Sequence, residues 1–311
     1  MIQQQDVITV EGLRKCYGSV KAVDRVTFQV RKNEIFGMVG PNGSGKTTTI
    51  ECIEGLRHPD EGRLSVLGLN PQRDIYELRE RIGVQLQSSN LPSRMRAEEA
   101  LNLFSSFYRQ AADWRPLLEE LGLSDKRRAL YSQLSGGQKQ RLFVALALIN
   151  HPEIVFLDEL TTGLDPQARH ATWDLVREIQ RRGATVFLTT HFMEEAERLC
   201  DRVAILDHGR IIALDTPMNL VNQLSMGTRI IFQVNKQDTA ALQLAPIGAI
   251  DGVRRVEQRG EEVVVYGQGD GLISAVILAL ETARLPIHSL RTEQANLEDA
   301  FLALTGQAIR D

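Results

Sequence analysis

Residues 34–56 decide the predicted fold, and they read Glu34-Ile35-Phe36-Gly37-Met38-Val39-Gly40-Pro41-Asn42-Gly43-Ser44-Gly45-Lys46-Thr47-Thr48-Thr49-Ile50-Glu51-Cys52-Ile53-Glu54-Gly55-Leu56. The apolar run at residues 35–39 predicts a buried strand. Residues 46–54 contain neither glycine nor proline and predict a helix. The residues between them match G-x-x-x-x-G-K-[ST], the pattern of a phosphate-binding loop. The stretch therefore predicts a strand, a phosphate loop and a helix, in that order.

The composition of this loop is that of an anion-binding nest. Its three glycines let the backbone turn so that N–H groups point inward, and the helix N-terminus adds partial positive charge. Lys46 would then reach the β- and γ-phosphates of a nucleoside triphosphate, and the Thr47 hydroxyl would hold Mg²⁺. The alternative is a glycine-rich turn that binds nothing, and the complete set of residue types in the expected order disfavours it. The predicted nucleotide contacts here are Gly40, Pro41, Asn42, Gly43, Ser44, Gly45, Lys46, Thr47 and Thr48.

The overall composition is that of an ordinary globular protein. The 311 residues suggest two domains, and 43% hydrophobic and 24% charged residues are usual values. No apolar run of about 18 residues occurs, and we expect neither a membrane span nor a signal peptide. The net charge of −4 gives no reason to expect nucleic acid as a partner, and the three cysteines have no metal-ligand spacing.

The remainder of the first two thirds alternates between strands and helices. This alternation predicts an α/β core with a mainly parallel sheet, of the P-loop NTPase kind, interrupted by a helical subdomain at residues 88–150. The expected strands are residues 7–10, 26–30, 63–67, 82–87, 154–157 and 185–190, with a hairpin at 203–206 and 210–213. The expected helices are residues 97–121, 135–150 and 167–182.

A domain boundary is predicted between residues 224 and 225. The first domain, 1–224, would contain the phosphate loop, and the second, 225–311, would be a small α+β domain. Its expected order is strand 229–234, helix 238–244, strands 253–258 and 262–266, helix 272–284, strand 287–292 and helix 297–304. This order resembles a split β-α-β-β-α-β unit with a closing helix.

Four further motifs narrow the nucleotide chemistry. Residues 134–138 read Leu-Ser-Gly-Gly-Gln and open an alanine-rich helix, and a predicted strand ends at Asp158 and Glu159. Asp165 follows a glycine and a leucine, and His191 ends the next strand. At a strand end beside the phosphate loop, Asp158 can hold a hydrated Mg²⁺. Together with the loop, this set resembles the ATP-binding subunit of ABC transporters over residues 7–220.

The resemblance implies a role for each matching residue. Glu159 would be the general base that polarises the attacking water. Gln87 would contact Mg²⁺ and water and sense the γ-phosphate, although Gln85, two residues earlier, is a rival. His191 would hydrogen-bond the γ-phosphate. Tyr17 would stack on adenine, and the alternative for it is an ordinary tyrosine on a surface turn.

The resemblance also implies a site shared between two chains. The start of the alanine-rich helix would face the γ-phosphate of ATP held by a second copy, so that two ATP molecules lie in a head-to-tail homodimer. A plain helix N-cap explains the same serine and glycines, and the two interpretations are compatible. The residues predicted to complete this site are Ser135, Gly136, Gly137, Gln138 and Asp165.

Two local features qualify the resemblance. Leu160 stands where the family usually has proline. The loss of proline gives the backbone of that turn more freedom in the unfolded chain. Residues 295–306 resemble the tail of drug- and antibiotic-exporter ATPases of the daunorubicin-resistance type. The plain interpretation of this tail is a helix that packs through Leu297, Phe301 and Leu304, spaced i, i+4, i+7.

The expected function is the ATP-hydrolysing subunit of an exporter. It would bind ATP and Mg²⁺, dimerise, and drive a separate transmembrane permease from the cytoplasmic face of the membrane. The alternative is a soluble ABC ATPase that acts on translation or DNA. Such relatives usually carry two cassettes or a long coiled-coil insert, and neither occurs in this sequence.

Overall fold

The computed structural model describes residues 5–86, 90–223, 227–234, 244–269, 271–283 and 287–306. The chain divides into two compact units, Met1–Thr216 and Pro217–Ala308. Helix α8 (Pro217–Gln223) belongs to the second unit, where it contacts α12 (Leu297–Thr305), whereas the sequence prediction placed it in the first domain. Within the described residues, no helix combines the length and the apolar character needed to cross a lipid bilayer.

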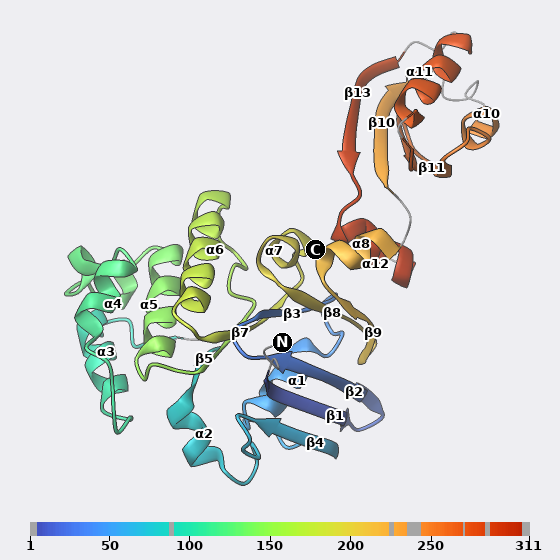
Figure 1. The fold of residues 1–311 in the computed structure, drawn as a ribbon. Coiled ribbons are helices and arrows are strands. Elements are labelled where there is room, and N and C mark those ends of the chain that lie inside the picture. The colour runs from blue at the N-terminus through green and yellow to red at the C-terminus, as the bar shows by residue number, and fades with distance from the viewer. Residues whose placement is uncertain are drawn as a thin grey trace. The chain divides into compact units, whose positions relative to one another are not determined.

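The first unit is built on a six-stranded sheet in the order β5-β6-β7-β3-β8-β9 (Figure 1). All neighbouring strands run parallel except β8 and β9, which form the predicted antiparallel hairpin. Every residue of β3, β6 and β7 is buried, as expected for strands with both faces covered. The α/β fold is therefore confirmed. The strands are β3 (Ile35–Val39), β5 (Ile82–Gln85), β6 (Ile154–Asp158), β7 (Thr185–Thr190), β8 (Arg202–Asp207) and β9 (Arg210–Asp215).

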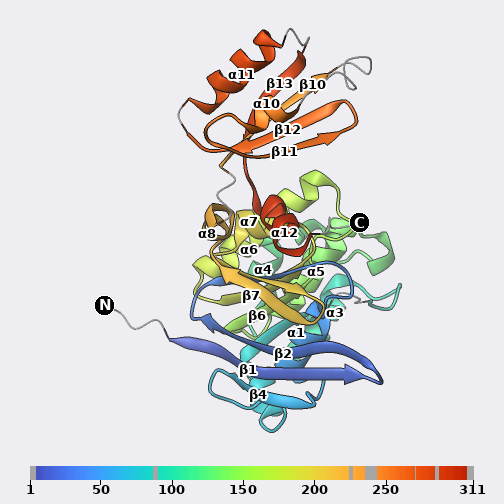
Figure 2. The same ribbon diagram turned by 90° about the vertical axis from the view of Figure 1, so that its right-hand side faces the viewer.

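A separate antiparallel sheet, in the order β2-β1-β4, forms a second layer of this unit (Figure 2). Its strands are β1 (Asp6–Tyr17), β2 (Val20–Arg31) and β4 (Glu61–Val66). The first two are longer than predicted because pairing continues through several register shifts into polar sequence. Phe28 of β2 stacks on Phe36 of β3, with ring centroids 5.2 Å apart, and so joins the two sheets in one core.

Among its described residues, the first unit has seven α-helices that surround or extend this sheet. They are α1 (Lys46–Ile53), α2 (Ile75–Arg81), α3 (Ala97–Ser105), α4 (Trp114–Glu120), α5 (Gly136–Leu148), α6 (Pro166–Arg181) and α7 (Met193–Leu199). Two short 3₁₀ turns, Ser124–Lys126 and Tyr131–Gln133, precede α5. Helices α3, α4 and α5 form the predicted helical subdomain, with a core of its own.

The prediction of one helix over residues 97–121 was wrong, because α3 and α4 are separate. Pro116 is tolerated only in the first turn of a helix, and the structure places it at the third residue of α4. The Asp113 side chain caps α4, and the Trp114 indole N–H donates to the Asn102 side-chain oxygen on α3 at 2.9 Å. The chain thus turns so that both helices pack on the same core.

The second unit contains a four-stranded antiparallel sheet in the order β11-β12-β10-β13. This is the order of a split β-α-β-β-α-β unit. The predicted helix at 238–244 lies outside the described residues except for residue 244. On α12, Leu297 and Phe301 are buried, but Leu304 is 42% exposed, so the predicted packing face ends one turn early. The elements are β10 (Thr228–Val234), α10 (Leu244–Gly248), β11 (Val253–Arg259), β12 (Glu262–Gly267), α11 (Leu272–Thr282), β13 (Ile287–Gln294) and α12.

Candidate functional site

The loop between β3 and α1 is pressed against two neighbouring strands. A Cβ atom on Gly40 would lie 2.1 Å from the Leu206 carbonyl oxygen, and one on Gly45 would lie 2.2 Å from the Ala22 carbonyl oxygen. Gly45 also has φ of 105°, which disfavours residues with a side chain. Glycine is therefore required at these positions, because the loop packs backbone against backbone.

Lys46, the first residue of α1, points back along this loop. Its ammonium group donates to the carbonyl oxygens of Gly40 at 2.8 Å and Pro41 at 3.1 Å. Its side chain is 4% exposed, and its nitrogen lies 3.8 Å from a carboxylate oxygen of Glu159. Burial lowers the pKa of Lys46, while the nearby carboxylates of Glu159 and Asp158 oppose that shift. The lysine is a buried cation held beside two acidic side chains.

The end of β6 places Asp158 beside two threonine hydroxyls. Thr189, its partner in the β6–β7 ladder, donates a hydrogen bond to the Asp158 carboxylate, and Thr47 of α1 forms another. Burial raises the pKa of Asp158, and these hydroxyls counteract the rise. The predicted metal ligands Thr47 and Asp158 thus meet, and their oxygens are of the kind that Mg²⁺ prefers. The third predicted ligand, Gln87, lies outside the described residues.

Gln85, the alternative candidate to Gln87, is buried in β5. The side-chain amide of Gln85 donates to the Leu86 carbonyl oxygen at 2.7 Å. Thr189 was missed by the sequence analysis. The signal for it was its place near the end of a buried strand that pairs with the strand of the acidic pair, where it lies directly opposite Asp158. Asp158 on β6 faces Thr189 on β7 because parallel strands in register end at the same edge of the sheet.

Glu159 and His191 face each other across the ends of β6 and β7. A Glu159 carboxylate oxygen lies 3.5 Å from His191 Nδ1, and the Glu159 side chain is 6% exposed. The Glu159 backbone has φ of 49°, an uncommon value for a residue other than glycine, and its N–H donates to the Thr189 carbonyl oxygen at 3.1 Å. Leu160, in place of the usual proline, is buried in the core at 4% exposure and so anchors this turn.

The predicted motif at the start of α5 forms a reciprocal helix cap. Gln138 N–H donates to the Ser135 hydroxyl at 3.3 Å, and Ser135 N–H donates to the Gln138 side-chain oxygen at 3.0 Å. Asp165 caps α6 in one direction only, by accepting from Ala168 N–H at 2.9 Å. Ser135, Gly136 and Asp165 are all exposed, so both capped helix starts present themselves to solvent.

Tyr17, at the end of β1, is 43% exposed. The Arg57 guanidinium carbon lies 5.3 Å from the centroid of its ring, and the Lys15 ammonium nitrogen lies 5.9 Å from it. These cations support the ring while part of its surface stays accessible. The same hairpin carries Ala22, whose carbonyl oxygen abuts Gly45 of the phosphate loop.

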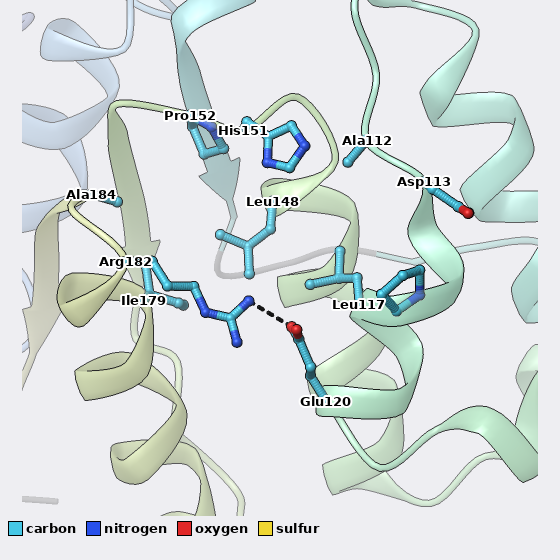
Figure 3. Close-up of a pocket in the computed structure, with 11 residues that line it drawn as sticks. Ala112, Asp113, Leu117, Glu120, Leu148, His151, Pro152, Ile179, Arg182 and Ala184 are labelled. Carbon is cyan, nitrogen blue, oxygen red and sulfur yellow. Dashed lines mark hydrogen bonds and ion pairs between the residues drawn. The ribbon is translucent and has the colours of Figure 1, made fainter.

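A cavity of about 420 Å³ lies elsewhere in this unit, between the helical subdomain and the end of α6 (Figure 3). Leu117 and Leu148 form part of its wall, and an ion pair of 2.6 Å between Arg182 and Glu120 crosses it. None of the predicted nucleotide residues lines it. The cavity is therefore separate from the candidate site at the strand ends.

Comparison with known proteins gives a consistent result. The family model described as ABC transporter matches residues 23–162. The Nod factor export ATP-binding protein I of Ralstonia nicotianae is 41% identical, with 98% of this chain and 95% of that protein covered. Its counterpart in Burkholderia orbicola is 39% identical, with 98% of both covered.

Solved structures match about two thirds of the chain or slightly more. An ATP-binding subunit of an ABC transporter is 30% identical with a TM-score of 0.64, covering 70% of this chain and 93% of that one. A bacterial ABC transporter cassette, solved as a dimer, is 27% identical with a TM-score of 0.60, covering 67% of this chain and 98% of that one. The same cassette has been solved in a dimeric post-hydrolysis state bound to ADP and Pi.

Proposed function

This chain belongs to the ABC transporter family, and we propose that it is the ATPase subunit of an exporter that drives a separate transmembrane permease. ABC ATPases hydrolyse ATP to power transport, and the full-length relatives are named as export ATP-binding proteins. That name supports transport over the alternative action on translation or DNA. In this proposal the chain is attached to the cytoplasmic face of the membrane through its permease.

One observation carries the proposed chemistry: three polar side chains, from the start of α1 and the ends of β6 and β7, meet at one place. A single Glu159 oxygen lies 3.8 Å from the Lys46 ammonium nitrogen and 3.5 Å from His191 Nδ1. We assign Lys46 to the β- and γ-phosphates, Glu159 to the attacking water as general base, and His191 to the γ-phosphate. A carboxylate between a lysine and a histidine can take a proton from water while the cation and imidazole meet the phosphate.

The metal site fits Mg²⁺ by the chemistry of its donors. Thr47 and Asp158 provide a hydroxyl and a carboxylate that already hydrogen-bond to each other, and Gln87 is the third proposed ligand. When bound, Mg²⁺ would neutralise charge that develops on the phosphates. Asp158 is buried, and a cation beside it would favour its ionised form.

The second half of the site comes, in this proposal, from another copy of the chain. Ser135 and Gly136 are exposed at a helix N-terminus and Gly137 is half-buried there, where N–H groups and a hydroxyl can bind an anion. A similar cassette has a dimeric structure, which supports a dimer of this chain. In our proposal the two copies lie head to tail around two ATP molecules. Gln138 holds the Ser135 cap, and Asp165 begins α6 beside it.

The chemical proposal is tested with Glu159→Gln. This change keeps the shape and hydrogen-bonding capacity of the side chain but removes its basicity, so turnover should fall by about 10²–10⁴-fold while ATP binding persists. Glu178→Gln, an exposed glutamate on α6, is the matched control and should leave turnover unchanged. Steady-state activity near that of the wild type in Glu159→Gln would remove this residue from the role of general base.

The transport proposal is tested by capturing the chain from detergent-solubilised membranes. A protein with several membrane spans should copurify and should stimulate ATP hydrolysis when the two are reconstituted in vesicles. Recovery of the chain only with ribosomes or DNA would contradict the exporter assignment and favour the alternative.

A further inference from the structure

Glu195, a buried acidic residue on α7, has no part in the chemistry described so far. It is 3% exposed and lies four residues after His191. The Trp173 indole N–H, from α6, donates to its carboxylate at 3.0 Å. The hydroxyls of Thr190 and Thr161 also act on this carboxylate and lower its pKa. An ionised carboxyl is costly to bury without partners, and these donors offset that cost.

Thr190 connects this carboxylate to the backbone around His191. The Thr190 side-chain oxygen accepts the N–H of Phe192 at 3.0 Å, which leaves its hydroxyl hydrogen available to Glu195, whose pKa this hydroxyl lowers. The residues immediately before and after His191 are therefore held by one hydroxyl, and Glu195 sets the orientation of that hydroxyl. Burial raises the pKa of Glu195, and the Thr190 hydroxyl is the foremost group that lowers it again.

Helix α6 contacts the same segment a second time. The Arg169 guanidinium carbon lies 4.3 Å from the centroid of the Phe192 ring, and that ring lies 4.1 Å from the imidazole of His191. Arg169 and Trp173 are four residues apart, and Asp165 precedes Arg169 by four, so the three share one face of the helix. The helix that begins just after the turn of Glu159 thus supports His191 at two points.

We propose that Glu195 is a positioning residue that fixes His191 with respect to Glu159. It does so by binding the Thr190 hydroxyl on one side and the Trp173 indole of α6 on the other. A shift of the α6 N-terminus would therefore also shift His191. The inference rests on the proposed function, since it takes His191 as the residue that meets the γ-phosphate.

The first test compares Glu195→Gln with Glu194→Gln, the same change at the exposed neighbour on α7. Glutamine has the same shape but can accept through only one of its two terminal atoms, so the hydroxyl of Thr190 loses its defined direction. We expect kcat for ATP to fall about tenfold in Glu195→Gln, since small misplacements of reacting groups are costly. KM for ATP should stay within about twofold, and Glu194→Gln should match the wild type in both constants.

The second test asks whether Glu195 acts through His191. Both glutamine variants are remade in a His191→Ala background, and single-turnover rates are measured. If the inference holds, Glu195→Gln should slow the parent about tenfold but the His191→Ala protein less than twofold. An equal loss in both backgrounds would overturn the positioning role. If His191→Ala alone hydrolyses ATP at the wild-type rate, the proposed contact of His191 with the γ-phosphate is refuted. Any loss of rate in Glu195→Gln would then have a cause other than His191.

A rescue pair covers the case in which Glu195→Gln does not fold. Thr190→Val removes the bridging hydroxyl and keeps the volume, and Thr190→Ser restores the hydroxyl. We expect Thr190→Val to lose kcat about tenfold at unchanged KM and Thr190→Ser to recover at least half of the parent rate. Equal activity in the valine and serine variants would show that the hydroxyl link to Glu195 has no role in turnover.

Discussion

Helices α1 and α5 both begin with a glycine-rich segment, but the two starts differ in their surroundings. Gly40 and Gly45 before α1 are pressed against β8 and β2, and Lys46 at its first position is 4% exposed. The glycines that open α5 lie in open space: a Cβ on Gly136 would meet no atom within 4 Å, and one on Gly137 would approach only Ala168, at 3.5 Å. The first helix start is enclosed by its own chain, and the second is not.

This difference indicates how each start would bind an anion. The α1 segment has no side-chain cap, and its charged partners, Asp158 and Glu159, come from the same chain. The α5 segment caps itself through Ser135 and leaves its outer surface exposed. A buried start can hold phosphate within one chain, whereas an exposed start can complete a site only when another molecule approaches.

The largest effect is expected when two defective chains are mixed, because this experiment distinguishes the role of the α1 segment from that of the α5 segment. Lys46→Ala and Ser135→Arg should each be inactive alone, because every site of either homodimer lacks one part. A mixed dimer contains one site with both defects and one with neither, so nucleotide trapped per dimer should reappear on mixing. Specific activity of the wild type should also rise with protein concentration.

Measuring trapped nucleotide is preferable to turnover, because the damaged site of a mixed dimer can hinder closure. A Ser135→Arg protein that hydrolyses ATP normally by itself, independent of concentration, would contradict the shared site. Ser135 would then be a helix cap that serves its own chain only.

The next largest effect concerns the other end of α1, which is buried as well. Glu54 is 2% exposed, neither carboxyl oxygen has a hydrogen-bond partner among the described residues, and burial raises its pKa well above 4.5. Above pH 4.5 the unfolded chain releases this proton while the folded chain retains it. Stability is therefore lost as pH rises toward the folded pKa, by about 1.4 kcal/mol per pH unit.

Glu54→Gln should remove this dependence. The variant should be more stable than the parent at pH 7, and the difference should shrink as the pH falls toward 4.5, as measured by urea unfolding. Glu51→Gln, on the same helix but paired with Arg57, is the control. A difference between Glu54→Gln and the parent that stays constant with pH would show that the folded protein ionises Glu54 normally.

A smaller effect is expected for the half-exposed ring beside the phosphate loop. Tyr17→Ala should weaken ATP binding about tenfold, since stacking of an aromatic side chain on a base is worth about 1–3 kcal/mol. The rate of a single turnover at saturating ATP should not change. Tyr76→Ala, an 83% exposed tyrosine on α2, should have no effect in the same titration. Unchanged affinity in Tyr17→Ala would return Tyr17 to the role of a surface-turn residue.

The smallest effect concerns the placement of the subdomain that carries α5. The ion pair between Arg182 and Glu120 joins α4 to the end of α6, and both side chains are almost half exposed. Arg182→Gln should cost less than about 1 kcal/mol, because exposed ion pairs contribute little. The loss is measured by thermal unfolding of Arg182→Gln next to the control Arg181→Gln, a change at a side chain that is 71% exposed. A larger loss would mean that this contact matters to the position of α5.

Local patterns predicted the strands and helices of the first unit well where a single hydrophobic periodicity, that of a strand or that of a helix, dominated the segment. The buried strands β3, β6 and β7 and the helix after Pro166 appear within a residue or two of their expected bounds. The predicted bounds were wrong where a long-range contact outweighed the local periodicity. Pro116 and the Trp114–Asn102 bond divide the predicted helix at 97–121, and β1 extends because β2 and β4 pair with it.

The sequence by itself determined the phosphate loop and the family, because the residues that define them are neighbours in the chain. Glycines, Lys46 and Thr47 lie within one short segment, where spacing alone dictates how strand, loop and helix join. Only the tertiary structure decided which distant groups meet them. Parallel strands in register bring Glu159 and His191 to the same edge as Lys46, and packing of α6 on α7 joins Trp173 to Glu195. No periodicity encodes such contacts, because they depend on which elements pack together and not on the order of residues within any one of them.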